Sequence, residues 1–234
     1  GPQAHIGQDI KNGTQLAIDD ANAANIEIGG VKLKFELLAE DDEANPKTAT
    51  VVAQKLADAK VAGVVGHFNS GASIPASRIY SDAGIPQISP SSTSPTYTNQ
   101  GYKTTFRLVA NDSQQGPAIG NYAVKELGAK KIAIIDDRTA YGQGLADEVE
   151  KTIKAAGGEV VKREFTTDKA TDFTAILTTL KGLKPDVIMF GGIDPQAGPM
   201  AKQMKSLGIN AKFIGGDGWQ TPNFIKLAGD AADG

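Results

Sequence analysis

A repeated alternation of helical stretches and short apolar runs is the feature that most constrains the fold of this sequence. In the second half of the chain, the pattern predicts strands over residues 131–135, 158–164, 186–190 and 212–215. It predicts helices over residues 113–127, 142–156, 171–181, 195–207 and 221–229. Gly128, Gly157 and Gly208 stand at the ends of three of these helices, as C-cap glycines do. Repeated strand–helix–strand units with short connections predict an α/β fold of parallel sheets covered by helices.

The first half of the chain follows the same rhythm but lacks an opening strand. Its pattern predicts helices over residues 7–24, 46–59 and 71–83, and strands over residues 31–38, 61–65 and 85–89. Alternate residues of the run 31–38 would share one face of a strand: Val31, Leu33, Phe35 and Leu37. A strand precedes helix 142–156, whereas none precedes helix 7–24. We therefore expect two doubly wound parallel-sheet lobes, residues 1–111 and 112–234, and the first lobe is expected to lack its first strand.

The composition argues against several classes of function. The 234 residues carry a formal net charge of -3 and no basic stripe interleaved with aromatics, which argues against nucleic-acid binding. No apolar run approaches the ~18 residues of a membrane-spanning helix. The absence of cysteine removes disulfides, thiolate metal sites and cysteine nucleophiles. The acidic pairs Asp19-Asp20, Asp41-Asp42 and Asp136-Asp137 lack the spacing of a calcium loop, so we interpret them as solvated helix faces or strand ends and expect neither a metal nor a cofactor.

Loops rich in small and polar residues follow four of the predicted strands. They span residues 68–73, 89–95, 136–142 and 215–219. In a parallel sheet, the loops at the carboxyl ends of the strands border the crevice where ligands bind. The sequence therefore predicts that a binding site is built from these loops.

The first of these loops brings Ser70 to the start of a predicted helix, and three roles are open to it. Unpaired amides and the helix dipole favour a carboxylate or phosphate there. Alternatively, Ser70 caps its own helix. As a nucleophile it would need His67 as its base, but the G-x-S-x-G pattern is absent because Asn69 and Gly71 flank it.

The other three loops carry one notable residue each. Thr93 stands among four serines, whose hydroxyls donate or accept hydrogen bonds. Tyr141 opens the run YGQG (141–144), which is not a dinucleotide fingerprint because Asp147 replaces the third glycine; Tyr141 forms an aromatic wall or packs beneath the loop. Asp217 lies between two glycines, where it can accept hydrogen bonds from a ligand amine or serve as an ordinary turn aspartate.

Five stretches of the sequence resemble the leucine/isoleucine/valine-binding protein family, the type I periplasmic binding proteins of branched-chain amino-acid ABC transporters. They are VVGHFNS (64–70), IPQISPSSTSP (85–95), SQQGP (113–117), YGQG (141–144) and LAGDAADG (227–234), and the opening GPQAHIG (1–7) is similar to the family's first ligand loop. The resemblance implies a two-lobed periplasmic receptor, not an enzyme. Such a receptor closes on an α-amino acid and delivers it to a transporter permease.

The resemblance also implies roles for particular residues. Ser70 and Thr93 match the residues that hold the ligand carboxylate. Ser92, through its backbone carbonyl, and Asp217 match those that hold the ammonium group. The remaining residues expected to line the pocket are His5, Ile6, Phe68, Asn69, Ser91, Tyr141, Ile193, Asp194 and Trp219.

The sequence departs from the family pattern in ways that keep other interpretations open. Asp194, in the run GGIDP over residues 191–195, adds a carboxylate that would favour a polar or cationic ligand side chain, and Asp217 is shorter than the glutamate common in the family. Family chains are also longer at both ends, so the first lobe would lack C-terminal elements as well and expose sheet edges to a second copy. The alternatives are a truncated or engineered fragment, monomeric or oligomeric, without tight binding, and an enzyme that is either a serine hydrolase or nucleotide-dependent.

Overall fold

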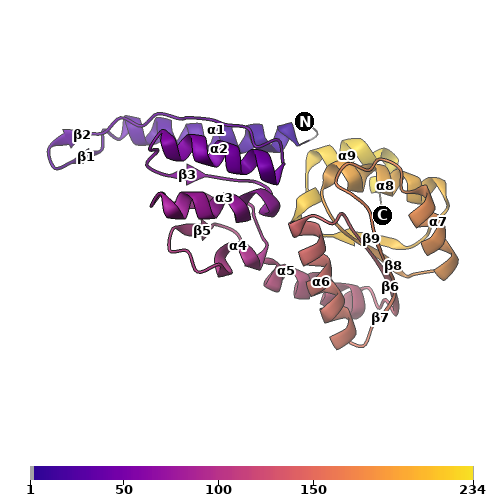
Figure 1. Cartoon of the computed structure of the whole chain (residues 1–234). Coiled ribbons are helices and arrows are strands. Elements are labelled where there is room, and N and C mark those ends of the chain that lie inside the picture. The colour runs from indigo at the N-terminus through magenta and orange to yellow at the C-terminus, as the bar shows by residue number, and fades with distance from the viewer. Residues whose placement is uncertain (1–2, 234) are drawn as a thin grey trace. The chain divides into compact units, whose positions relative to one another are not determined.

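The chain, described here over residues 3–233 by a computed structural model, divides into two compact units (Figure 1). The boundary between them falls between Val109 and Ala110. Gly1, Pro2 and Gly234, which belong to the first and last of the recognised motifs, lie outside the described residues. No helix within residues 3–233 is long and apolar enough to cross a membrane.

The second unit is built around one parallel sheet. Its four strands are β6 (Lys131–Asp136), β7 (Glu159–Phe165), β8 (Val187–Gly191) and β9 (Lys212–Gly215), in the order β7-β6-β8-β9. Its α-helices are α5 (Asp112–Asn121), α6 (Ala140–Ala155), α7 (Thr174–Leu183), α8 (Asp194–Ser206) and α9 (Pro222–Ala228). Shorter turns are η1 (Tyr122–Glu126), a π-helical extension of α5, and the 3-10 helices η2 (Asp217–Trp219) and η3 (Gly229–Ala232). The predicted parallel α/β fold is confirmed.

Helices cover both faces of this sheet, because its inner strands are apolar on both sides. On one face, Ile132 and Ile134 of β6 pack with buried residues of α6 such as Leu145 and Val149. On the other face, Ile135 of β6 packs in the cluster that contains residues of α7 and α8. Strands buried on both faces read as continuous apolar runs, and this is why the 131–135 segment is recognisable in the sequence.

The first unit holds a smaller parallel sheet. Its strands, in spatial order, are β3 (Val64–Val65), β4 (Gln87–Ser89) and β5 (Thr105–Arg107). Its helices are α1 (Ala4–Ala23), α2 (Pro46–Asp58), α3 (Ser70–Asp82) and α4 (Pro95–Asn99). A separate antiparallel hairpin joins β1 (Glu27–Ile28) to β2 (Val31–Lys32). Ala53 and Leu56 of α2 pack with Ala76 and Tyr80 of α3 to form the core of this unit.

The predicted strand at 31–38 is wrong beyond its first two residues. Leu33, Phe35 and Leu37 are partly buried and alternate with exposed residues, so the predicted periodicity is present. A strand also needs a neighbouring strand to pair with, and among the described residues this segment has none after Lys32. Instead, the Asn22 side chain of α1 bonds the backbone of Phe35, accepting from its N–H at 2.8 Å and donating to its C=O at 3.0 Å.

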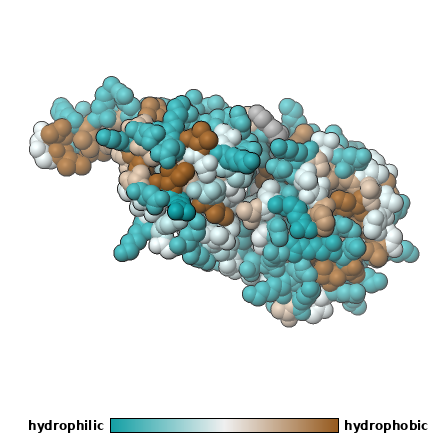
Figure 2. Space-filling view, in the orientation of Figure 1, coloured by the Kyte–Doolittle hydropathy of each residue, from teal (hydrophilic) through white to brown (hydrophobic). Residues whose placement is uncertain are grey.

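The first unit exposes apolar side chains at the β1–β2 hairpin and on its sheet, among other places. Figure 2 shows hydrophobic residues at the tip formed by the β1–β2 hairpin, where Ile28 and Val31 are exposed. On the sheet, Val65, Ile88 and Phe106 are also exposed and are neighbours in register across its three strands. This row leaves one face of the sheet uncovered by the described residues.

Candidate functional site

Ser70 is the first residue of α3, and its side chain does not cap that helix. Its hydroxyl oxygen accepts a hydrogen bond from the backbone N–H of Ser94 at 3.2 Å. Asn69, in the N-cap position, makes no side-chain cap bond within the described residues and donates to Gln3 Oε1 at 2.9 Å instead. The first N–H groups of a helix have no intrahelical partner. The start of α3 therefore retains the character of an anion site.

The loop that follows β4 is held by serine hydroxyls that converge on consecutive carbonyl groups. Ser89 donates to the His67 carbonyl oxygen at 2.7 Å. Ser91 and Ser92 donate to the Phe68 carbonyl oxygen at 3.1 and 3.0 Å. The sequence predicted hydroxyl groups at this edge of the sheet; the structure shows that most of them fasten the loop.

The Thr93 hydroxyl does not take part in this fastening. Thr93 is 2% exposed, and its hydroxyl has no hydrogen-bond partner among residues 3–233. Leaving a buried hydroxyl unpaired costs about 1–3 kcal/mol. A ligand oxygen that accepted this hydrogen bond would recover much of that cost.

Ser92 presents a carbonyl group that is already in use. Arg107 donates from Nη1 to the Ser92 carbonyl oxygen at 2.7 Å and to that of Ser94 at 3.0 Å. A carbonyl oxygen has two lone pairs, so it can accept one further hydrogen bond. The role in ammonium binding implied for Ser92 is compatible with this geometry.

The His67 ring makes hydrogen bonds that do not involve Ser70, so the two residues do not form a base–nucleophile pair. Its Nδ1 lies 2.6 Å from Asp42 Oδ2 and its Nε2 lies 3.3 Å from the Tyr80 hydroxyl. Ser70 is bonded to Ser94 instead. The arrangement that a serine hydrolase requires, with the base bonded to the nucleophile, does not form here. The contact also corrects the interpretation of Asp41-Asp42 as a solvated pair, because Asp42 is half-buried against an imidazole.

In the second unit, the strand order places the binding crevice at the carboxyl ends of β6 and β8. The chain crosses from β6 to β7 on one side and reaches β8 on the other, and ligands bind where the winding direction reverses in this way. Tyr141 follows β6, Ile193 follows β8, and Asp217 follows the neighbouring strand β9.

Tyr141 packs beneath the loop that carries Asp217 and orients it. Its hydroxyl donates to Asp217 Oδ1 at 2.9 Å and accepts from the backbone N–H of Gly218 at 3.0 Å. Gln115 Oε1 accepts from the Asp217 N–H at 2.7 Å. Burial first, and then the charge of Asp217, raise the pKa of the Tyr141 hydroxyl well above its usual range, so it remains a donor. The Asp217 side chain itself is exposed.

The glycines on either side of Asp217 are required by this packing. A Cβ atom on Gly216 would lie 2.7 Å from the Tyr141 hydroxyl oxygen, and one on Gly218 would lie 2.8 Å from Tyr141 Cε1. Tyr141 packs beneath the loop, which is one of the two roles considered for it, and its place in a pocket wall stays a prediction. The G-G-D-G pattern allows the loop to approach the ring.

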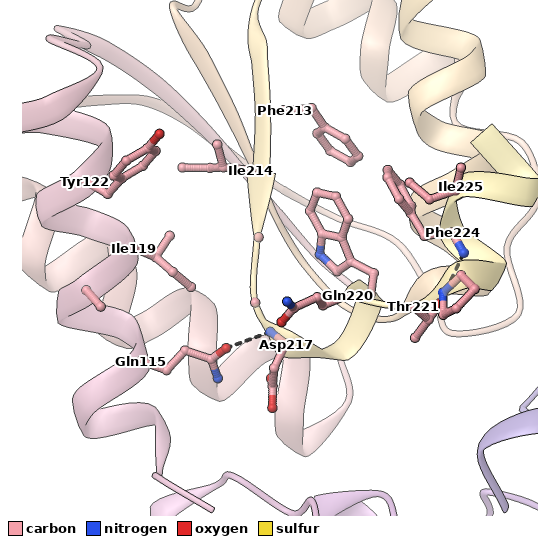
Figure 3. Close-up of a pocket in the computed structure, with 15 residues that line it drawn as sticks. Gln115, Ile119, Tyr122, Phe213, Ile214, Asp217, Gln220, Thr221, Phe224 and Ile225 are labelled. Atoms are coloured by element: carbon pink, nitrogen blue, oxygen red, sulfur yellow. Dashed lines mark hydrogen bonds between the residues drawn. The ribbon is translucent and has the colours of Figure 1, made fainter. Parts of the chain in front are cut away.

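Trp219 and Asp217 both border one hollow, but their side chains lie differently. Trp219 stacks on Phe213 and packs at a tilt against Phe224, with ring centroids 4.8 Å apart in both cases. All three rings line an apolar hollow of about 1110 Å³ within the second unit. Figure 3 shows that the Asp217 carboxylate points away from Phe213 and Phe224. Trp219 therefore supports the loop from the aromatic side.

Asp194 and Ile193 are buried at the start of α8. Asp194 Oδ2 accepts from Thr221 Oγ1 at 2.7 Å and from Asn223 Nδ2 at 3.1 Å. The carboxylate thus holds the start of α9, which is not the environment expected of a group that selects a cationic side chain. Ile193 is 5% exposed.

The predicted wall residues of the first unit are more scattered. Phe68, Asn69 and Ser91 are partly buried in the two loops around Ser70 and Thr93. His5 and Ile6 lie on α1 rather than in a loop, and His5 is exposed. Among the described residues, no cluster of side chains with the makings of a metal site is present.

Parallel α/β units with polar loops at the carboxyl ends of their strands define a class of ligand-binding proteins. The chain matches the periplasmic binding protein family over residues 1–234 and belongs to that family. It is 41% identical over 235 residues to Leu/Ile/Val-binding protein homolog 1 of Brucella abortus, which covers 100% of this chain. It is 37% identical to the leucine-, isoleucine-, valine-, threonine-, and alanine-binding protein of Pseudomonas aeruginosa, again over 100% of this chain. The chain spans 62% of the length of each of these relatives.

Solved structures give the same result. The branched-chain amino acid transporter substrate binding protein LivJ of Streptococcus pneumoniae, in complex with isoleucine, superimposes with a TM-score of 0.82 at 33% identity. The match covers 94% of this chain and 62% of that one. The resemblance inferred from the sequence is thus confirmed. The family consists of solute-binding proteins for transporters and not of enzymes, as predicted.

Asp137, which follows β6, gives a pH-dependent prediction. Burial raises the pKa of its carboxyl group to about 6, although Thr139 donates to it from both its N–H and its hydroxyl. A folded-state pKa above the unfolded value of about 3.9 means that the stability contributed by the protonated form is present below pH 4 and is lost as pH rises through 6. Asparagine keeps the acceptor oxygen without the charge. Asp137→Asn is therefore expected to raise the free energy of unfolding at pH 7.5 by about 2 kcal/mol and to leave it unchanged at pH 4.

Urea unfolding of both proteins at the two pH values measures this difference. An equal effect of the substitution at pH 4 and pH 7.5 would show that the Asp137 charge is not the cause.

Proposed function

We propose that this chain is the ligand-binding part of a solute receptor that takes an α-amino acid to an ABC transporter. The ligand is expected to be branched-chain, aliphatic or small and polar. The names of the relatives support this, as does the isoleucine complex of the Streptococcus pneumoniae protein. Thr93 is the observation in this chain that carries the proposal, because its buried hydroxyl lacks an acceptor among the described residues and lies in a loop bonded to the start of α3.

Residues of the chain are assigned to the two ends of the proposed amino acid. In the first unit, Ser70, Thr93 and the opening amides of α3 bind the carboxylate, which the helix dipole also favours. The Asp217 carboxylate is assigned to the ammonium group, and so is the Ser92 carbonyl oxygen. Tyr141 orients Asp217.

The partner and location follow from the same proposal. We propose that the protein acts in the periplasm and delivers its ligand to a transporter permease. The edge strand β3 has only two residues, which offers little backbone to pair with another chain. We therefore assign association with a second copy to the exposed apolar row of Val65, Ile88 and Phe106. Light-scattering mass measurements at several concentrations test that association.

The first experiment is a thermal-shift screen of this chain against the twenty amino acids, followed by calorimetry. A ligand at 100 times its Kd stabilises the folded state by about 2.7 kcal/mol, which is readily detected. We expect leucine, isoleucine or valine to raise Tm. A chain that binds none of the twenty would overturn the proposal and favour the interpretation as a fragment without tight binding.

Thr93→Val tests the carboxylate assignment. Valine fills nearly the same volume but cannot donate a hydrogen bond, so affinity for L-leucine is expected to fall by roughly tenfold or more. The stability of the unliganded chain should not fall, since a buried unpaired hydroxyl is removed. Calorimetry and thermal unfolding measure the two effects.

Thr105→Val is the matched control. The Thr105 hydroxyl on β5 is also buried without a partner among the described residues, but it has no assigned role in binding. This variant is expected to bind L-leucine as the parent chain does. If both variants bind as the parent chain does, or both lose affinity equally, the assignment of Thr93 is wrong.

A further inference from the structure

The Asp42–His67 pair is a half-buried ionisable contact that the proposed binding contacts do not use. His67 is 8% exposed, its Nδ1 lies 2.6 Å from Asp42 Oδ2, and its ring stacks on Tyr80 with centroids 6.0 Å apart. The other Asp42 oxygen, Oδ1, accepts from the Ala44 N–H at 2.8 Å. Asp42 is therefore fixed in its own turn while it holds the imidazole.

Both ring nitrogens of His67 have a partner. An ionised Asp42 can only accept, so Nδ1 carries the proton and donates it. The hydrogen bond from His67 lowers the pKa of Asp42, against the effect of burial, which alone would raise it. Burial raises the pKa of the Tyr80 hydroxyl, so that group remains protonated, and it lies 3.3 Å from Nε2. Both ring nitrogens are thus engaged, and the side chain is fixed in orientation.

The backbone of the same residue anchors the ligand loop. Three serine hydroxyl groups lie within hydrogen-bond distance of the His67 carbonyl oxygen: Ser89 at 2.7 Å, Ser73 at 3.1 Å and Ser92 at 3.2 Å. Ser73 and Ser92 also bond one another at 2.7 Å. These serines come from α3, from the end of β4 and from the loop that contains Thr93. The position of the His67 backbone therefore determines where α3 and the Thr93 loop meet.

We propose that Asp42 is a positioning residue for ligand binding: by fixing the His67 ring it holds the carbonyl to which the serines of the carboxylate-binding loops are anchored. This inference rests on the proposed function. It assigns a role in binding to a residue that touches no ligand. In enzymes, a 1 Å misplacement of a reacting group can lower the rate about a hundredfold. We expect displaced binding groups to lower ligand affinity for the same geometric reason.

The test compares three variants for L-leucine affinity by calorimetry and for the state of His67 by ¹⁵N NMR of the imidazole rings. His5 is the only other histidine in the sequence, so the signals are readily assigned. Asp42→Ala removes the acceptor and is expected to lower affinity about tenfold and to lose the Nδ1–H signature of His67. Asp42→Asn retains an acceptor oxygen and is expected to restore the signature and bring affinity to within about threefold of the parent chain.

Asp41→Ala is the matched control. Asp41 is the neighbouring carboxylate, and its Oδ1 accepts only the turn N–H of Glu43 at 2.8 Å within the described contacts of its side chain. Removing the Asp41 carboxylate alters the same turn but leaves the contact between Asp42 and His67 in place. Affinity and the His67 spectrum should both remain unchanged.

The outcomes separate this inference from the proposed function. A parent chain that binds no amino acid overturns the proposed function and this inference with it. A parent chain that binds L-leucine, with Asp42→Ala folded and binding equally well, overturns the positioning role alone. If Asp42→Ala does not fold, the Asp42→Asn variant decides the question. Affinity like that of the parent chain together with a retained Nδ1–H signal of His67 supports the positioning role. The same affinity with that signal lost contradicts it.

Discussion

Alanine in place of Asp217 is expected to weaken L-leucine binding by about a hundredfold or more. Asp217 is the exposed carboxylate that Tyr141 orients, and the proposed ligand carries an ammonium group that must be paired when it leaves water. Removing one partner of such a charge-assisted contact costs about 2–5 kcal/mol, most of it from the group left unpaired. Titration calorimetry of the two proteins measures the loss directly.

Two further measurements identify the source of that loss. Asp217→Glu keeps the charge and is expected to retain most of the affinity, whereas Asp217→Asn should lose nearly as much as alanine. Thermal unfolding without ligand should change little in Asp217→Glu and Asp217→Asn, because both keep an acceptor for the Tyr141 hydroxyl, whereas Asp217→Ala leaves that donor unpaired and should lower Tm. Binding within threefold of the parent chain for Asp217→Ala would remove Asp217 from the site.

A methyl group on Gly142 is expected to destabilise the second unit by about 3 kcal/mol and to lower its Tm by about 10 °C. The Cβ atom of an alanine there would lie 2.4 Å from the Gly191 carbonyl oxygen and 2.2 Å from Asp137 Oδ1. One neighbour is the backbone of β8 and the other is a buried side chain, so neither can move at low cost. Differential scanning calorimetry gives the change in Tm.

Gly144→Ala in the same helix is the control. A Cβ atom on Gly144 meets nothing within 4 Å, and alanine is favoured over glycine in a helix by up to about 1 kcal/mol. We expect its Tm to be unchanged or slightly raised. If the two variants behaved alike, the close approach of α6 to β8 would not be the reason that position 142 requires glycine.

The second unit is more predictable than the first because its inner strands are continuous apolar segments. The run at 131–135 is apolar on both faces and is therefore visible in the sequence. In the first unit, β5 has three residues and α4 has five, which is too short for a periodic signal, and neither was predicted. The run at 31–38 shows the reverse problem: it has the periodicity of a strand, but pairing depends on a neighbour elsewhere in the chain.

The candidate site is predictable where a residue acts through its place in a loop. Ser70, Thr93 and Asp217 follow strands, and that can be inferred from pattern alone. The contacts that hold these loops in place cannot be inferred in this way. Asp42 is 25 residues from His67, and the acidic pair gives no sign that one member meets an imidazole. Similarly, the sequence suggests a pocket role for Asp194, because nothing in it shows that Thr221 and Asn223 bond this carboxylate.

The fastening of the Thr93 loop to the His67 and Phe68 carbonyls has a kinetic consequence. Several side-chain rotors and the loop backbone are already immobilised in the unliganded chain, so their entropy is lost during folding and not during capture of the ligand. Association at this loop should accordingly proceed without a slow ordering step. Substitutions that loosen the serine anchors would then slow capture as well as hasten release, and a change in both rate constants would distinguish them from the loss of a single ligand contact.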